Sequence, residues 1–152
     1  DIYSSPMSQG TRCHQLATYI VFDSPLVMLC DAPTAYRKEP ECTRFIAGLP
    51  VVADETRILQ GKMGEYIVTA RRVGEDWIVG GLTDWEARTV DLDLSFLPEG
   101  MFRAEIFCDG INADKKGEDY RHEYRDVKRE DRLKMQLAPG GGFAIRLEKN
   151  HN

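Results

Sequence analysis

From residue 51 to the end of the chain, apolar and polar residues alternate with a period of two. Every second side chain is apolar in four segments: 90–96, 102–108, 133–137 and 143–147. Strict alternation is typical of a strand with one buried and one exposed face. Together with segment 56–59, a hairpin within 64–85 and a weaker segment at 122–127, the pattern predicts about eight strands.

The hairpin signal lies between Gly64 and Trp85. Two runs rich in Ile, Val, Thr, Tyr and Trp flank the polar residues Gly74-Glu75-Asp76, which predicts two antiparallel strands joined by a three-residue loop. Turn residues separate the other predicted strands at 97–100, 109–110, 115–117 and 139–142. Because each strand has one apolar face, we expect two antiparallel sheets packed face to face as a β-sandwich.

The first third of the chain begins with a helical period instead. Apolar residues recur at positions i, i+3, i+4, i+7 and i+8 from Cys13 to Val21, the spacing of one helix face. Thr11 or Ser8 is available as the N-cap, and Ser24-Pro25 ends the pattern. A helix is therefore predicted between residues 10 and 23.

A buried strand and a second helix follow. The continuous apolar run 26–30 is typical of a strand buried on both faces. Pro40 and Gly48 mark the start and the end of a short helix. A single buried strand cannot cover itself, so we expect an incomplete α/β layer that needs partners outside this sequence, and a chain that is a fragment of a longer protein.

Composition and charge narrow the classes of function. The 152 residues carry a formal net charge of −5, with Lys and Arg scattered among Asp and Glu, which argues against a nucleic-acid surface. No apolar run approaches the roughly 20 residues of a membrane span, and the chain starts at Asp1 without a signal-peptide pattern. No C-x-x-C pair occurs, so we expect buried thiols rather than disulfides or zinc ligands at Cys13, Cys30, Cys42 and Cys108.

Asp31 is the carboxylate with the strongest claim to a functional role. It follows the predicted buried strand, and substrate-binding groups collect at the carboxyl ends of barrel strands; the alternative is a cap of the turn before Pro33. The segment Asp109–Asp114 is rich in oxygen ligands but lacks the spacing of a calcium loop, so a polar loop between strands is favoured. His14 lies beside Cys13 on a predicted helix and is interpreted as a packing or hydrogen-bonding residue, and neither His122 nor His151 has a Ser or Cys nearby in the sequence that would suggest a catalytic triad.

Four aromatic residues of the predicted strands could form a sugar-stacking platform: Tyr66, Trp77, Trp85 and Phe107. Aromatic residues in strands are more often core residues or cross-strand pairs. Trp85 follows Thr83-Asp84 at a predicted strand end, where its ring is least committed to the core. It is therefore the candidate sugar-binding residue.

In their order and density, the motifs resemble the C-terminal end of glycoside hydrolase family 97, the bacterial α-glucosidases and α-galactosidases. The resemblance extends from Gly10 to Leu147. It rests on the segments GTRCHQLA (10–17), FDSPLVMLCDAP (22–33), EPEC (39–42), FI (45–46), LP (49–50), DET (54–56), GKMGEY (61–66), ARR (70–72), W (77), LTDW (82–85), DLDLSFL (91–97), DGINAD (109–114) and LAPGGGF (137–143).

This resemblance implies a parent enzyme with an N-terminal β-sandwich, a calcium-binding (β/α)8 barrel that hydrolyses α-glycosidic bonds, and a structural or oligomerising C-terminal β-domain. Residues 1–49 would be the last helix–strand–helix segment of the barrel, and residues 50–152 the C-terminal β-sandwich. The catalytic and calcium-binding carboxylates of the family belong upstream of Asp1, so none is assigned here. Asp31 would end the last barrel strand.

We therefore expect a mostly β chain that is inactive alone. The resemblance assigns the hydrolysis of α-linked oligosaccharides and the calcium to the full-length parent, in the periplasm or at the outer membrane. A homo-oligomer is the expected assembly, and neither nucleic acid nor a membrane span is expected. The alternative is a carbohydrate-binding module that uses Trp85 and neighbouring aromatic residues.

Overall fold

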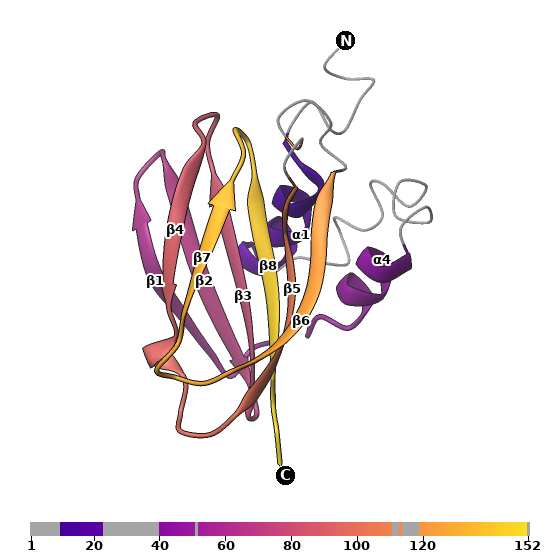
Figure 1. The fold of residues 1–152 in the computed structure, drawn as a ribbon, viewed down its shortest axis with the longest axis vertical. Helices are drawn as coiled ribbons and strands as arrows, with labels where there is room; N and C mark the ends of the chain where they lie inside the picture. Colours follow the sequence, from indigo (N-terminus) through magenta and orange to yellow (C-terminus); the bar gives the residue numbers. More distant parts are fainter. Residues whose placement is uncertain (1–9, 23–39, 51, 111–112, 114–118, 152) are drawn as a thin grey trace.

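The computed structural model describes residues 10–22, 40–50, 52–110, 113 and 119–151. These residues form a β-sandwich with two helices on one side (Figure 1). The helices are α1 (Arg12–Val21) and α4 (Pro40–Ala47). The strands are β1 (Glu55–Lys62), β2 (Tyr66–Val73), β3 (Asp76–Thr83), β4 (Arg88–Asp93), β5 (Phe102–Asp109), β6 (Tyr120–Val127), β7 (Arg132–Leu137) and β8 (Gly142–Lys149). No described helix is long and apolar enough to cross a membrane.

The strands form two antiparallel sheets, which confirms the predicted sandwich and its number of strands. The larger sheet has the order β1-β2-β3-β8-β5-β6, and the smaller one pairs β4 with β7. The core between the sheets contains the alternating apolar residues that the sequence pattern marks, such as Val90, Leu92, Ile106 and Met135. The predicted strand 90–96 ends at Asp93, because the Asp93 carboxylate accepts the Ser95 N–H at 2.9 Å and starts a short 3-10 helix, Leu94–Phe96.

The predicted hairpin is β2–β3, but its loop is shorter than expected. Val73 pairs with Asp76, so the loop contains two residues, Gly74 and Glu75, and the expected three-residue loop is wrong. Gly74 has a φ of +62°, a conformation that glycine adopts without steric cost. Its N–H also donates to the Asp54 carboxylate at 2.8 Å, which fixes the tight turn.

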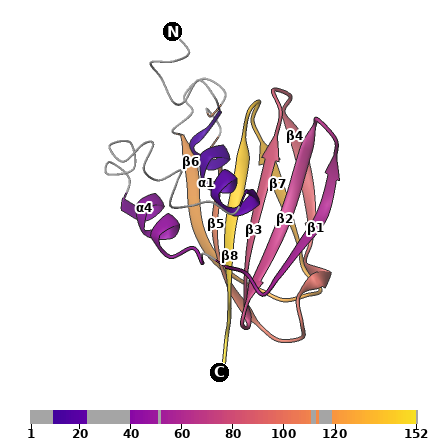
Figure 2. The same cartoon turned by 180° about the vertical axis from the view of Figure 1, so that it is seen from behind.

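Both helices pack on the outer face of the six-stranded sheet (Figure 2). Of the two predicted N-caps of α1, Thr11 is the one in the structure, and its hydroxyl accepts the His14 N–H at 3.0 Å. Leu16 and Ile20 of α1 and Phe45 of α4 are buried in one cluster with sheet residues Ile78, Phe107 and Ala144. The described helices therefore bury their apolar faces against the chain's own sheet, where the sequence predicted a need for outside partners. The predicted strand 26–30 lies outside the described residues.

Arg71 of β2 joins the end of α1 to the sheet. Its Nε donates to the carbonyl of Ile20 at 2.5 Å, and its Nη2 donates to the carbonyl of Val21 at 3.1 Å. The last carbonyls of a helix have no partner within the helix and attract positive charge. The guanidinium thus satisfies two of them and fixes the position of α1 on the sheet.

Candidate functional surfaces

Trp85 lies just beyond β3 with 65% of its surface exposed. A Cβ added to Gly140 would lie 2.6 Å from its Cζ3, so the indole lies directly on the glycine turn that precedes β8. The neighbouring Asp84 carboxylate accepts the Glu86 N–H at 3.0 Å and an Arg88 N–H at 3.1 Å. These hydrogen bonds, that of Glu86 first, lower the pKa of Asp84. The corner thus presents an aromatic ring beside a fixed ion pair, whereas Asp31 lies outside the described residues.

Two of the other aromatic candidates, Trp77 and Phe107, do not share a surface with Trp85. Trp77 is 2% exposed and packs edge-on against Phe96 between the two sheets, with ring centroids 5.0 Å apart. Phe107 is fully buried on the opposite face of the larger sheet, in the cluster under the helices. Tyr66 packs against the inter-sheet core. The structure therefore contradicts a platform of all four rings, and Trp85 is the most exposed of the four.

Asp109, at the end of β5, forms a buried junction. Its Oδ2 accepts the Ala138 N–H at 2.9 Å and the Gly142 N–H at 3.1 Å. A Cβ on Gly141 would lie 1.9 Å from this oxygen, so the carboxylate fits only against glycine. Burial raises the pKa of Asp109. The start of the calcium-like motif is thus a structural anchor, and the described part of the chain contains no cluster of three or more His, Cys, Asp or Glu suited to a metal.

His122 of β6 lies between two carboxylates. Its Nε2 is 2.9 Å from Glu105 Oε2 on β5, and its Nδ1 is 3.3 Å from Glu41 Oε2 on α4. The imidazole is stacked on Phe107, with ring centroids 4.2 Å apart. The Tyr120 hydroxyl also donates to Glu41, and burial raises the pKa of Tyr120. No sequence motif indicated this cluster, because its members lie far apart along the chain; the cluster holds α4 against the sheet.

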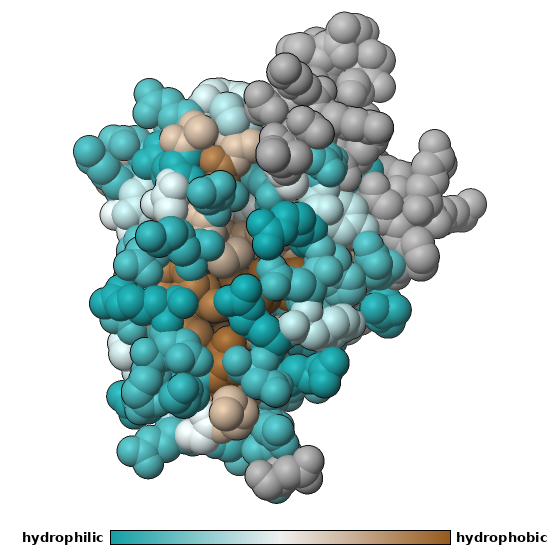
Figure 3. Space-filling view, viewed as in Figure 1, coloured by the Kyte–Doolittle hydropathy of each residue, from teal (hydrophilic) through white to brown (hydrophobic). Residues whose placement is uncertain are grey.

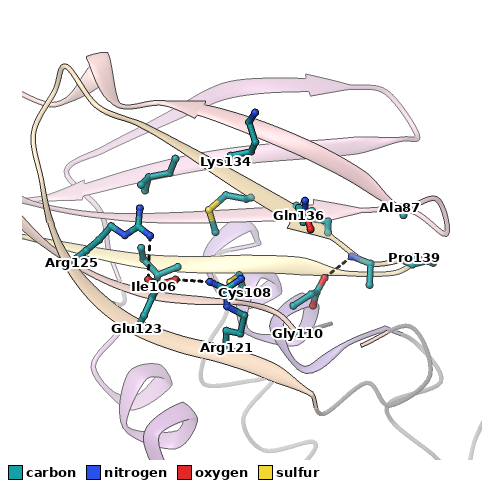
Figure 4. A pocket seen from close by; sticks show the side chains of 15 residues that line it. Ala87, Ile106, Cys108, Gly110, Arg121, Glu123, Arg125, Lys134, Gln136 and Pro139 are labelled. Atoms are coloured by element: carbon teal, nitrogen blue, oxygen red, sulfur yellow. Dashed lines mark hydrogen bonds and ion pairs between the residues drawn. The ribbon is translucent and has the colours of Figure 1, made fainter. Parts of the chain in front are cut away.

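A hollow of about 710 Å³ lies between β7 and the β5–β6 side of the larger sheet (Figure 4). In the described part of the chain the smaller sheet has two strands. Figure 3 shows an apolar patch in the middle of this face with hydrophilic side chains around it. Arg121 and Arg125 border the hollow, each paired with Glu123 at 3.3 and 3.2 Å. Burial raises the pKa of Cys108, so its thiol is a packing group and not an activated nucleophile.

These surfaces define a supporting β-domain with a layer of helices, in which the described polar clusters hold segments together. Residues 52–148 match the family model "Glycosyl-hydrolase 97 C-terminal, oligomerisation". The chain belongs to this family, as the sequence motifs predicted.

Two curated relatives and a solved structure extend the match. The chain is 57% identical, over 96% of its length, to a retaining alpha-galactosidase from Bacteroides thetaiotaomicron, and it covers 22% of that protein. It is 30% identical, over 86% of its length, to a probable retaining alpha-galactosidase from Streptomyces bingchenggensis, of which it covers 19%. The chain thus spans about a fifth of the length of these relatives.

The structural match gives the same fold. A glycoside hydrolase family 97 enzyme from Pseudoalteromonas sp. strain K8, in complex with acarbose, superposes with a TM-score of 0.82 at 32% identity. The match covers 93% of this chain and 23% of that one. Residues 50–152 make up only about two thirds of the sequence, so a match of this extent includes part of the helical first third.

Proposed function

We propose that the chain supplies the C-terminal support and self-association of an α-galactosidase whose hydrolytic site is formed by other parts of the parent. The observation that carries this proposal is the 57% identity to a retaining alpha-galactosidase, of which the chain covers 22%. That relative favours α-galactosides over α-glucosides as the substrate class. The family description, which names oligomerisation, supports the second part of the role.

The structural roles of three described carboxylates support a hydrolytic site elsewhere in the parent. Glycoside hydrolysis needs two carboxyl groups that face the scissile bond from opposite sides, roughly 5–10 Å apart. Glu41 and Glu105 have the His122 ring between them, and Asp109 is buried on backbone N–H groups. Each of these three carboxylates is thus engaged in holding segments of the fold together.

The division of the parent follows the same proposal. Residues 1–49 would complete a (β/α)8 barrel, and residues 50–152 would form the C-terminal domain whose outer sheet face carries α1 and α4. Calcium would be held by parts of the parent upstream of this chain. In this proposal the parent acts in the periplasm or at the outer membrane, as the family resemblance implies.

The isolated chain is expected to show no turnover of p-nitrophenyl α-galactoside, while the full-length parent hydrolyses this substrate in preference to the α-glucoside. Release of p-nitrophenol measures both, and circular dichroism confirms that the isolated chain is folded. The matched control is the full-length parent from which the residues of this chain have been deleted. Turnover by the pure chain that an active-site inhibitor suppresses would refute the division of labour, and a parent that prefers the α-glucoside would refute the substrate class.

Carbohydrate binding at Trp85 stays a second candidate because the ring is 65% exposed. A stacking site of this kind would give measurable heat with maltooligosaccharides, and Trp85→Ala would abolish it. Under the supporting role we expect no heat from either protein in isothermal titration calorimetry. Heat from the unaltered chain alone would establish the binding module.

A further inference from the structure

β6 is an edge strand of the larger sheet and pairs with β5 alone among the described strands. Its eight residues pair with β5 without a register shift. The opposite edge strand, β1, has a register irregularity between Ile58 and Gln60, and irregularities of this kind protect an edge from pairing with another chain. Among the described residues, no second strand pairs with the outer edge of β6, and a regular edge of this kind is a template for an additional strand. Of the two edges of the sheet, β6 is therefore better suited to pairing.

The charges along β6 are self-complementary. In a twofold dimer with a continuous antiparallel sheet, the strand pairs with its own copy about one central residue. Centring on Tyr124 places Glu123 opposite Arg125 of the second copy, and this pair occurs twice. Centring on Glu123 would place Arg121 opposite Arg125 and the two Glu123 side chains opposite each other. Like charges directly opposite destabilise a sheet, so this neighbouring register is disfavoured.

A further register, centred on His122, also pairs opposite charges, but α4 disfavours it. Glu41 of α4 contacts both Tyr120 and His122, so two helices would meet near the axis of such a dimer. The other half of β6 is more open, since Tyr124 is 48% exposed and both Arg125 and Asp126 are exposed. Arg125, one member of the complementary pair, therefore lies in the more open half of the strand.

Two contacts hold the side chain of Tyr124, the residue at the centre of the favoured register. Its hydroxyl donates to Glu105 Oε2 at 3.1 Å, and the Arg103 guanidinium lies 4.8 Å from the centre of its ring. A side chain that is already ordered loses less conformational freedom when a partner covers it. We propose that two copies of this chain associate through their β6 edges in the register centred on Tyr124, forming one continuous twelve-stranded sheet. This inference rests on the self-association in the proposed function and names its surface and its partner.

Charge exchange tests the register. Glu123→Arg or Arg125→Glu alone places like charges opposite each other twice and should weaken the dimer by roughly tenfold to a hundredfold. The double variant Glu123→Arg/Arg125→Glu restores both pairs and should recover most of the affinity. Lys62→Glu, with the same change of charge as Arg125→Glu but on β1, is the matched control and should have no effect. Sedimentation equilibrium of the full chain over a range of concentrations measures the dissociation constants.

Crosslinking tests the symmetry axis independently. Directly opposite residues of antiparallel strands have Cα atoms about 4.5–5.5 Å apart, within the range of a disulfide. Tyr124→Cys should therefore give a covalent dimer on mild oxidation, whereas Met63→Cys, at a fully exposed position, should not. If neither single charge variant changes the dissociation constant of the dimer and Tyr124→Cys gives no covalent dimer, the β6 surface is wrong while self-association itself stands. A chain that is monomeric at all concentrations would overturn both.

Discussion

Replacing Phe107 with alanine is expected to lower the free energy of unfolding by about 3–5 kcal/mol, the usual cost of removing a fully buried aromatic ring. The ring has no exposed surface. It packs edge-on against Phe45 of α4, with centroids 5.1 Å apart, and flat against His122 at 4.2 Å. The substitution would leave a cavity between the sheet and α4, bordered by two rings that lose their contact surface.

Urea denaturation followed by circular dichroism measures this effect, with Met63→Ala as the control. Met63 is fully exposed in the turn between β1 and β2, so its truncation should change stability by no more than about 0.5 kcal/mol. Hydrogen exchange adds a local measurement, because α4 should exchange faster in the Phe107 variant while β4 and β7 keep their relative protection. A loss below about 1 kcal/mol would mean that α4 is not packed on this ring in solution.

Phe107 also shows what the alternation of apolar and polar residues could not predict. The period of two predicted correctly that Phe102, Ala104 and Ile106 face the core between the sheets. It placed Phe107 on the outer face, where the ring was a candidate for sugar stacking. The outer face of β5 is covered by helices from the other end of the chain, and a strand's own alternation carries no signal of such a cover.

Local features were predictable and long-range ones were not. The Thr11 cap, the helix that starts at Pro40 and the eight strands depend on a few neighbouring residues each, and the structure confirms them. The order β3-β8-β5 in the larger sheet depends on which strands meet after long connections. No single segment encodes that choice, so the groups that meet between β5 and β8, such as the Asp109 carboxylate and the Gly142 N–H, could not be predicted.

Removing the Asp109 carboxylate is the second change with a large expected effect. Asp109→Ala leaves the buried N–H group of Gly142 and the part-buried N–H group of Ala138 without their acceptor. An unpaired buried group costs about 1–3 kcal/mol, and a part-buried one costs less because water can reach it, so we expect a loss of about 1–4 kcal/mol in the free energy of unfolding. Asp109→Asn keeps an acceptor oxygen for both N–H groups and should lose much less, as measured by urea denaturation. Equal losses in the two variants would show that these hydrogen bonds do not carry the effect.

The dependence of stability on pH distinguishes the charge of Asp109 from its hydrogen bonds. Because burial raises the pKa of Asp109 above that of the unfolded chain, the fold favours the protonated acid. Its contribution is fully present below the unfolded pKa of about 4 and is lost as the pH rises through the folded pKa. The amide introduced by Asp109→Asn cannot ionise, so this variant does not lose that contribution. Its free energy of unfolding should therefore rise relative to that of the unaltered chain between about pH 4 and neutrality. A relative decrease over this interval would mean that the backbone N–H groups favour the ionised carboxylate by more than burial disfavours it.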